Sequence, residues 1–224
     1  MSRMDDIEDG AASAEIHDLM AARMTKTSPV LEEALRYWTS KRTGGDLPAR
    51  DDLDPRAMQL IIGHSMILDR VRPGTVRVRV GGRIPNALMG METRGLPVRA
   101  FFDLLQRGEA ADLIETAFTA PATVEVEMVS DGDDGPVSAR LLILPLLDRD
   151  GAVSKALAVI VPDRLVTDGP RRFRMLRHSL GTIALPAVPP TPDQAVLVME
   201  PPSAAPSGQA WRPRPDAPYL RVVK

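Results

Sequence analysis

The stretch of sequence that decides the fold runs from Tyr37 to Val98. Its four informative pieces are YWTSKRTGGDLPARDDLDP (37–55), SMILDRV (65–71), VRVRVGG (76–82) and IPNALMGMETRGLPV (84–98). In order, they predict the end of an amphipathic helix, a link rich in Asp and Pro, two short strands and a helical segment interrupted by glycine. This order says more about architecture than about chemistry.

The helix that enters this stretch has a clear start signal. Ser28 can accept hydrogen bonds from the free N–H groups of the first turn, and Pro29 suits the first helical position. Leu31, Leu35 and Trp38 follow at helical spacing. Their apolar face must pack against a sheet or against a second copy of the chain. We therefore take these three residues as a candidate dimer or partner face, and we expect a homodimer.

Strands are predicted on both sides of a helical region. Residues 75–82 alternate valine with arginine, which indicates a strand with one buried and one exposed face. A preceding strand is expected over 64–71. Short helical turns are expected over 84–102, and a longer helix over 106–120, where apolar residues recur at i, i+3, i+4, i+7 and i+8.

Three further strands are predicted over 123–129, 137–147 and 155–161. The first alternates apolar and polar residues, but the second and third are apolar on both faces. A strand that is apolar on both faces should be covered on both sides. We expect the Trp38 helix to supply the second cover.

The remaining segments complete the predicted domain organisation. Residues 1–27 are predicted as an acidic leader with a short helix, and 28–163 as the domain with its N-terminal capping helix. Residues 164–185 are predicted as a basic C-terminal helix, and 186–224 as a flexible tail, since about half of the 21 prolines follow Leu185.

The predicted C-terminal helix contains the sequence PRRFRMLRHSLG and would bury Phe173, Leu176 and Leu180. Four arginines would then form an exposed basic face. A solvated surface and contact with an acidic partner are both open readings of this face, whereas nucleic-acid binding is disfavoured because no recognition motif accompanies it. The four residues are Arg171, Arg172, Arg174 and Arg177.

The composition bounds the class of protein. The chain has 224 residues and a net charge of −2, which fits one domain with flanking segments and gives no global attraction to nucleic acid. The absence of Cys excludes disulfides, thiolate metal sites and Cys nucleophiles. The acidic N-terminus lacks the apolar core of a signal peptide, and no apolar run is long enough for a membrane span. We therefore expect a cytoplasmic protein.

The order of these elements, together with particular residues, resembles a PAS-type sensor domain of the PAS_5-like single-domain family of alphaproteobacteria. The residues that carry the resemblance are Tyr37-Trp38, Leu47-Pro48, Arg50, Asp52, Asp54-Pro55 and the turn GMETRG from Gly90 to Gly95. The resemblance covers residues 31–163. It implies an α+β fold, with a five-stranded antiparallel sheet, helices on one face and an N-terminal capping helix.

The resemblance also bears on cofactors. Flavin photoreceptors of the PAS class need a Cys for their adduct, and this chain has none. Haem-binding PAS sensors typically offer a His from the long helix, and residues 106–120 contain none. Both cofactors are therefore disfavoured, and no cofactor is predicted. Since no recognisable output module follows the domain, we expect a non-enzymatic regulatory protein that contacts another signalling protein.

The histidines and aspartates that could bind a metal or act as acids and bases are better explained by structural roles. His17, His64 and His178 are far apart and lack the spacing of metal ligands. Asp51, Asp52 and Asp54 are better explained by turns and helix caps than by acid–base chemistry or calcium binding. Residues 131–135 (DGDDG) are read as a hairpin turn in the same way.

The predicted interior offers one further hypothesis. PAS folds often open a cavity between sheet and helices, so an apolar ligand could bind there and the protein could act chiefly as a small-molecule sensor. A filled core is the alternative. The side chains expected to line this region are those of Met66, Leu68, Val78, Leu88, Met89, Phe102, Leu113, Phe118, Val126, Met128 and Ile143.

Overall fold

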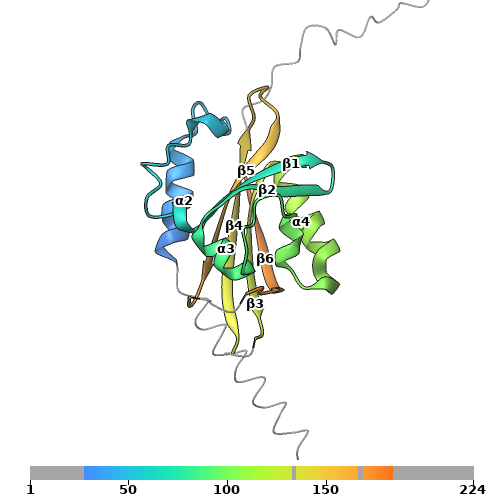
Figure 1. The fold of residues 1–224 in the computed structure, drawn as a ribbon. Coiled ribbons are helices and arrows are strands. Elements are labelled where there is room, and N and C mark those ends of the chain that lie inside the picture. Colours follow the sequence, from blue (N-terminus) through green and yellow to red (C-terminus); the bar gives the residue numbers. More distant parts are fainter. Residues whose placement is uncertain (1–27, 133–134, 166–168, 184–224) are drawn as a thin grey trace, which may run out of the picture. The chain divides into compact units, whose positions relative to one another are not determined.

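The computed structural model describes residues 28–132, 135–165 and 169–183. In these ranges the chain forms helices and one six-stranded antiparallel sheet (Figure 1). The helices are α2 (Pro29–Ser40), α3 (Arg83–Met89) and α4 (Arg107–Thr119), and the strands are β1 (Ser65–Arg72), β2 (Thr75–Gly81), β3 (Ala122–Ser130), β4 (Val137–Leu147), β5 (Val153–Pro162) and β6 (Arg174–Thr182). The predicted leader and Pro-rich tail lie outside the described residues.

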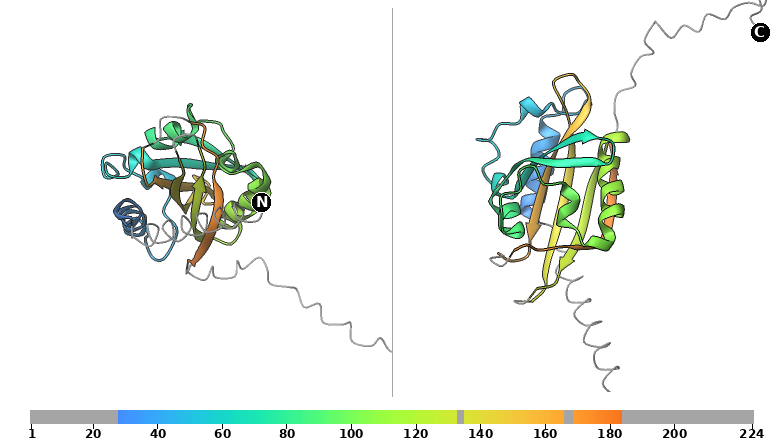
Figure 2. Two further views of the ribbon diagram at one scale, coloured as in Figure 1. Left: turned by 90° about the horizontal axis from the view of Figure 1, so that it is seen from below. Right: turned by 45° about the vertical axis from the view of Figure 1, so that its right-hand side comes forward.

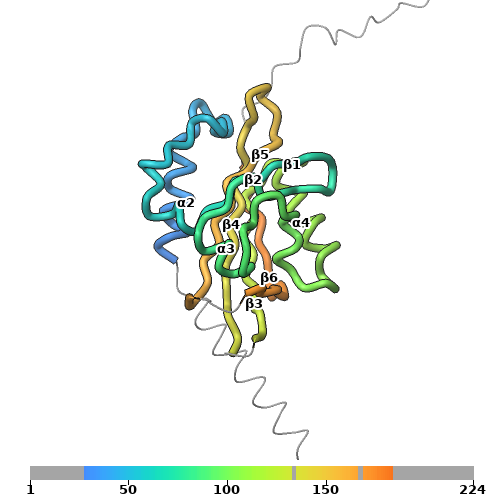
Figure 3. Tube along the Cα trace, in the orientation of Figure 1, coloured from blue at the N-terminus to red at the C-terminus, as the bar shows by residue number. Residues whose placement is uncertain are grey.

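The strands are ordered β2-β1-β5-β4-β3-β6. The β1–β2 hairpin joins the later strands through an antiparallel pairing of β1 with β5, in which Met66 lies opposite Ala158. This pairing brings the two parts of the strand sequence into one sheet. The trace in Figure 3 shows the tip of this hairpin next to α4.

Two apolar clusters lie on opposite faces of the sheet. The first, between the sheet and helices α3 and α4, includes Ile143 and Ala158. The second, between the sheet and α2, includes Leu144 and Leu157. Figure 1 shows α2 and α4 on opposite sides of the strands. Because side chains alternate along a strand, β4 and β5 contribute to both clusters.

Helix α2 is anchored by its aromatic residues. The indole Nε1 of Trp38 donates to the carbonyl of Pro145 at 2.9 Å, and the hydroxyl of Tyr37 accepts the N–H of Asp54 at 2.7 Å. Trp38 is 2% exposed, whereas Leu35 is 43% exposed. The prediction that Leu35 shares the buried face is therefore wrong. Ala34 and Tyr37 are buried together with Trp38, so the buried face of α2 does not include Leu35.

The C-terminal segment is a strand and not the predicted basic helix. β6 pairs with β3 along nearly its whole length, from Ala122 opposite Thr182 to Val129 opposite Arg174. β3 is buried and would otherwise leave a row of backbone N–H and C=O groups unpaired. This requirement outweighs the helical spacing of Phe173, Leu176 and Leu180, and it adds a sixth strand beyond the five that were expected. Figure 2 shows β6 running beside β3.

The register of β6 explains why its apolar spacing was misleading. A bulge lies where Glu127 pairs with Arg177 and the next residue, Met128, pairs with Met175. Leu176 is the extra residue at this point. Phe173 and Met175 are buried, whereas Leu180 is 50% exposed. A bulge interrupts the period-2 pattern, so the sequence of the strand did not reveal it.

The link between α2 and β1 is attached to the sheet by a backbone hydrogen bond between residues that are far apart in the sequence. The N–H of Leu147 donates to the carbonyl of Pro48 at 2.9 Å, which fastens the link to the end of β4. Residues 55–61 form turns, which are followed by a short 3-10 helix, η2 (Ile62–His64).

Replacement of Trp38 by alanine tests the cover on the second face. Trp38→Ala should lower the free energy of unfolding by about 3–5 kcal/mol, because it leaves a cavity and an unpaired carbonyl. Urea denaturation measures the loss. Leu35→Ala, on the same helix but half exposed, is the control and should change stability by less than about 1 kcal/mol. Equal effects of the two substitutions would contradict the assigned packing.

Replacement of Gly82 tests the close packing at the start of α3. A Cβ at this position would lie 2.5 Å from the carbonyl oxygen of Ile62 and 2.6 Å from that of Gly63. Gly82→Ala should therefore cost about 1–3 kcal/mol, since backbone must move. Gly108→Ala in α4 is the matched control, because its Cβ would meet nothing within 4 Å. It should leave the urea midpoint unchanged or raise it.

Candidate functional site

The residues expected to line a central ligand pocket come together as one packed core. All eleven are buried in the cluster between the sheet and helices α3 and α4. The largest of them, Phe102, is fully buried. None of the eleven lines any of the three surface cavities described below. Ligand binding by this core remains a prediction.

The first surface cavity is an apolar groove of about 210 Å³ at the edge of the sheet. It lies where the link after α2 meets β1 and the end of β2. Ile62 and Val80 are 44% and 53% exposed, and neighbouring Leu60 is 73% exposed. The groove is lined by Arg50, Leu53, Pro55, Met58, Ile62, Ser65, Ile67, Val80, Gly81 and Gly82, of which only Arg50 is charged.

The second cavity is a charged cleft of about 570 Å³ near the β4–β5 turn. Its charges balance, because four basic and four acidic side chains line it: Arg50, Arg79, Arg149, Lys155, Asp51, Asp69, Asp148 and Asp150. Lys155 pairs with Asp69 at 2.5 Å, and Arg149 with Asp51 at 3.1 Å. The Ser154 hydroxyl, followed by the N–H of Ala152, holds the pKa of Asp148 below its ordinary value. The carboxylates of Asp51, Asp69 and Asp148 are thus engaged in turn and ion-pair interactions.

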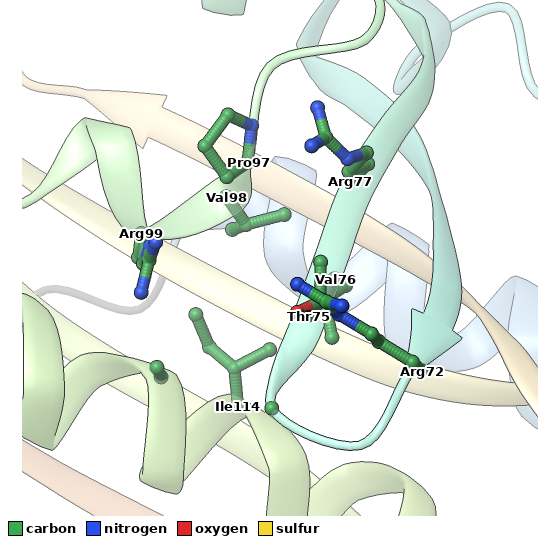
Figure 4. Close-up of a pocket in the computed structure, with 10 residues that line it drawn as sticks. Arg72, Thr75, Val76, Arg77, Pro97, Val98, Arg99 and Ile114 are labelled. Carbon is green, nitrogen blue, oxygen red and sulfur yellow. Dashed lines mark hydrogen bonds between the residues drawn. The ribbon is translucent and has the colours of Figure 1, made fainter.

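The third cavity is an arginine pocket of about 100 Å³ between the start of β2, the segment before α4 and α4 itself (Figure 4). The segment Val98–Phe101 is a short 3-10 helix, η3. Pro97 pairs with Arg77 of β2, which places η3 beside the strand. The pocket is lined by Arg72, Gly74, Thr75, Val76, Arg77, Pro97, Val98, Arg99, Ala111 and Ile114.

Sequence reasoning did not find the arginine pocket. Its arginines occupy three positions spread over 28 residues (72–99) of the chain, and only the alternation of Arg77 with valine gave a local signal. The pocket exists because the carbonyl of Leu96 accepts the N–H of Val78, and the N–H of Gly95 donates to the carbonyl of Val78. A contact of this kind leaves no periodic pattern in the sequence.

Most of the dimer face predicted on α2 is buried within the chain. Leu31 and Trp38 are 6% and 2% exposed, because they pack on the outer face of β4 and β5. Only Leu35 of the three stays accessible. A contact between two copies through all three side chains would therefore require α2 to leave the sheet.

The four arginines of the predicted basic face do not share one surface. Arg171 is buried and donates to the carbonyl of Gly135 at 3.2 Å. Burial, followed by the positive charge of Arg107, lowers the pKa of Arg172, whose Nη1 lies 3.1 Å from the sulfur of Met89. Arg174 and Arg177 are exposed on β6, and Arg177 pairs with Glu127. The helical basic face is therefore wrong, since the segment is extended.

Ser65 and His64, a hydroxyl and an imidazole that are adjacent in the sequence, each contact a backbone carbonyl. The hydroxyl of Ser65 donates to the carbonyl of Ile61 at 2.8 Å, and Nδ1 of His64 lies 3.0 Å from the carbonyl of Ile160. Neither contact is a nucleophile–base pair. His178 is exposed on β6, and His17 lies outside the described residues. The part of the chain that the structure describes contains no group of three His, Asp or Glu side chains that could hold a metal ion.

The acidic link confirms the capping interpretation at two of its three positions. Asp52 accepts the N–H of Ala49 at 2.9 Å, and Asp54 accepts the N–H of Arg56 at 2.9 Å. Asp51 instead forms the exposed ion pair described above. The DGDDG turn falls partly outside the described residues.

Comparison with known protein families identifies the family of this chain. A family model described as a PAS domain matches residues 26–161. The chain belongs to the PAS-domain family. The match spans α2 and strands β1 to β4 and reaches all but the last residue of β5, so the sixth strand of this PAS domain lies beyond the matched segment. No curated protein matches the chain. Among the described helices, none has the length and apolar character needed to cross a membrane.

Proposed function

We propose that this PAS domain is a non-enzymatic regulatory protein that acts through protein–protein contact. Membership of the PAS family carries the proposal, since it suggests a sensory or signalling role. Fold alone does not assign a partner. The partner surface must therefore be argued from the exposed side chains.

The apolar groove is the surface that best suits contact with a second copy of the chain. Its lining includes the exposed side chains of Ile62 and Val80, and only one of its lining residues is charged. A two-fold contact places the same patch on both partners, so an uncharged patch avoids repulsion between like charges. The β6 edge, which exposes Arg174 and Arg177, would bring like charges together. We assign the homodimer to the groove and contact with a further signalling protein to the surface left open.

A charge placed at the groove tests this assignment. Ile62→Glu should weaken self-association at least about tenfold, because a carboxylate would replace an apolar side chain and would lose its hydration in the contact. Sedimentation equilibrium measures the change. Val71→Glu is the matched control, since Val71 is 60% exposed on β1 and does not line the groove.

Two outcomes would count against the groove. A wild-type protein that is monomeric at all accessible concentrations would refute the homodimer. Equal weakening by Ile62→Glu and Val71→Glu, or no weakening by either, would place the contact elsewhere. Circular dichroism of both variants establishes that they are folded.

A second candidate function is that of a small-molecule sensor with an apolar ligand in the core. Four methionines, Met66, Met89, Met128 and Met175, belong to the cluster between the sheet and α3/α4. Methionine side chains are flexible and adapt their packing to a guest. A ligand there would act on α2 through β4 and β5, whose side chains reach both clusters, and would shift the population between two arrangements of that helix.

Native mass spectrometry of freshly purified protein separates the two candidates. If the protein is a small-molecule sensor, the native spectrum should show a ligand bound in a fixed stoichiometry, and its mass should disappear on denaturation. If the protein is a regulatory dimer, the spectrum should show twice the mass of the chain with no bound ligand. Ile143→Trp, which would fill space in the core cluster, should abolish the added mass while leaving the dimer intact. Retention of the added mass in a folded Ile143→Trp variant would place the ligand outside this core.

A further inference from the structure

The arginine pocket concentrates positive charge in a way that neither candidate function uses. Arg72, Arg77 and Arg99 all line it, and no carboxylate does. The three come from β1, β2 and η3, so the fold and not a local run of charge brings them together. Figure 4 shows Arg72 and Arg99 on either side of Val98 and Ile114, with Arg77 beyond Val98.

A carboxylate that contacts the pocket residue Gly74, that of Glu115, is already paired with Arg70. Glu115 of α4 accepts a hydrogen bond from Nε of Arg70 at 2.8 Å and one from the N–H of Gly74 at 3.1 Å. It also pairs with a terminal nitrogen of Arg70. The charge of Glu115 is thus balanced by Arg70, and the positive charges of the three pocket arginines remain available to a ligand.

The pocket arginines have hydrogen-bond donors that are available to a ligand. Nε of Arg72 donates to the hydroxyl of Thr75 at 3.3 Å, and Nη1 of Arg77 donates to the carbonyl of Gly95 at 2.7 Å. The side chain of Arg99 is exposed and has no hydrogen-bond or ion-pair partner among the described residues. Each guanidinium carries five N–H groups in a planar fork that matches the oxygens of phosphate. Most of these donors are therefore unused.

The floor of the pocket strengthens the attraction for an anion. Val76, Val98 and Ile114 are 7%, 1% and 1% exposed and belong to the core cluster. Apolar side chains keep water away from one side of the site, which reduces the screening of the guanidinium charges. A volume of about 100 Å³ suits a single phosphate group rather than a large ligand.

We propose that the arginine pocket binds the phosphate group of a small molecule, with Arg72, Arg77 and Arg99 as its ligands. The dianion would be held by charge-assisted hydrogen bonds from three elements, and it would join the β1–β2 hairpin to η3. The same chemistry fits inorganic phosphate and a phosphate monoester. The site shares no lining residue with the groove and includes none of the eleven residues predicted to line a ligand cavity in the core. Its test is therefore independent of the proposed function.

Titration with phosphate, followed by NMR of the full chain, tests the site. Above the second pKa of phosphate, inorganic phosphate should shift the arginine side-chain Nε–H signals of the pocket and the backbone amides of Val98 and Ala111, with saturation. Arg99→Gln should raise the Kd at least about fivefold, since one charge-assisted contact is lost. Arg72→Gln should do the same. Added sodium chloride should weaken binding through screening.

Matched controls distinguish a specific phosphate-binding site from nonspecific attraction of anions to positive charge. Arg56→Gln removes the same charge from an exposed position outside the three cavities and should leave the Kd unchanged. Methyl phosphate distinguishes the two sources: binding as tight as that of inorganic phosphate indicates an ester of a small molecule, whereas much weaker binding indicates the free ion. A response that does not saturate, that sodium acetate of equal ionic strength reproduces, or that Arg99→Gln and Arg56→Gln alter equally would overturn the proposal.

Discussion

Burial of both faces of β4 and β5 is the constraint on which the rest of the structure depends. Leu144 and Leu157 point to one side and Ile143 and Ala158 to the other. Each large apolar side chain contributes roughly 1.5–3 kcal/mol when it leaves water, so neither face can stay exposed. Helices α3 and α4 cover one face and α2 covers the other. The bond from Trp38 to the carbonyl of β4 fixes where α2 lies.

This arrangement decides which surfaces remain for function. Leu31 and Trp38 of α2 pack against the sheet and do not face a partner, and the central cluster is covered by the sheet on one side and by α3 and α4 on the other. The exposed surfaces that we assign to binding lie at the hairpin end of the sheet, where β2 is the edge strand. The apolar groove and the arginine pocket both border β2, one at its end and one at its start. Their chemistry differs, since one is nearly uncharged and the other is strongly basic, which suits two different kinds of ligand.

The opposite edge of the sheet shows how backbone pairing can outweigh side-chain pattern. β6 carries exposed arginines and a bulge, features that discourage pairing with another chain. It also completes the hydrogen bonding of β3. A sixth strand beyond the matched PAS segment therefore protects a buried strand. The arginines are distributed accordingly, with Arg171 buried and Arg177 paired on the surface.

The sequence by itself determined the PAS family, the strands β1 to β5, the long helix α4 and eleven residues of the central cluster, because periodic burial leaves a periodic pattern. It also predicted that Asp52 and Asp54 act as caps, since capping bonds span only a few residues. Only the tertiary structure decided that 174–182 is a strand, that Leu35 stays outside and that Arg72 and Arg99 share a pocket. Each of these depends on which distant backbone or side chain lies opposite, and residues far apart in the chain carry no local record of that contact.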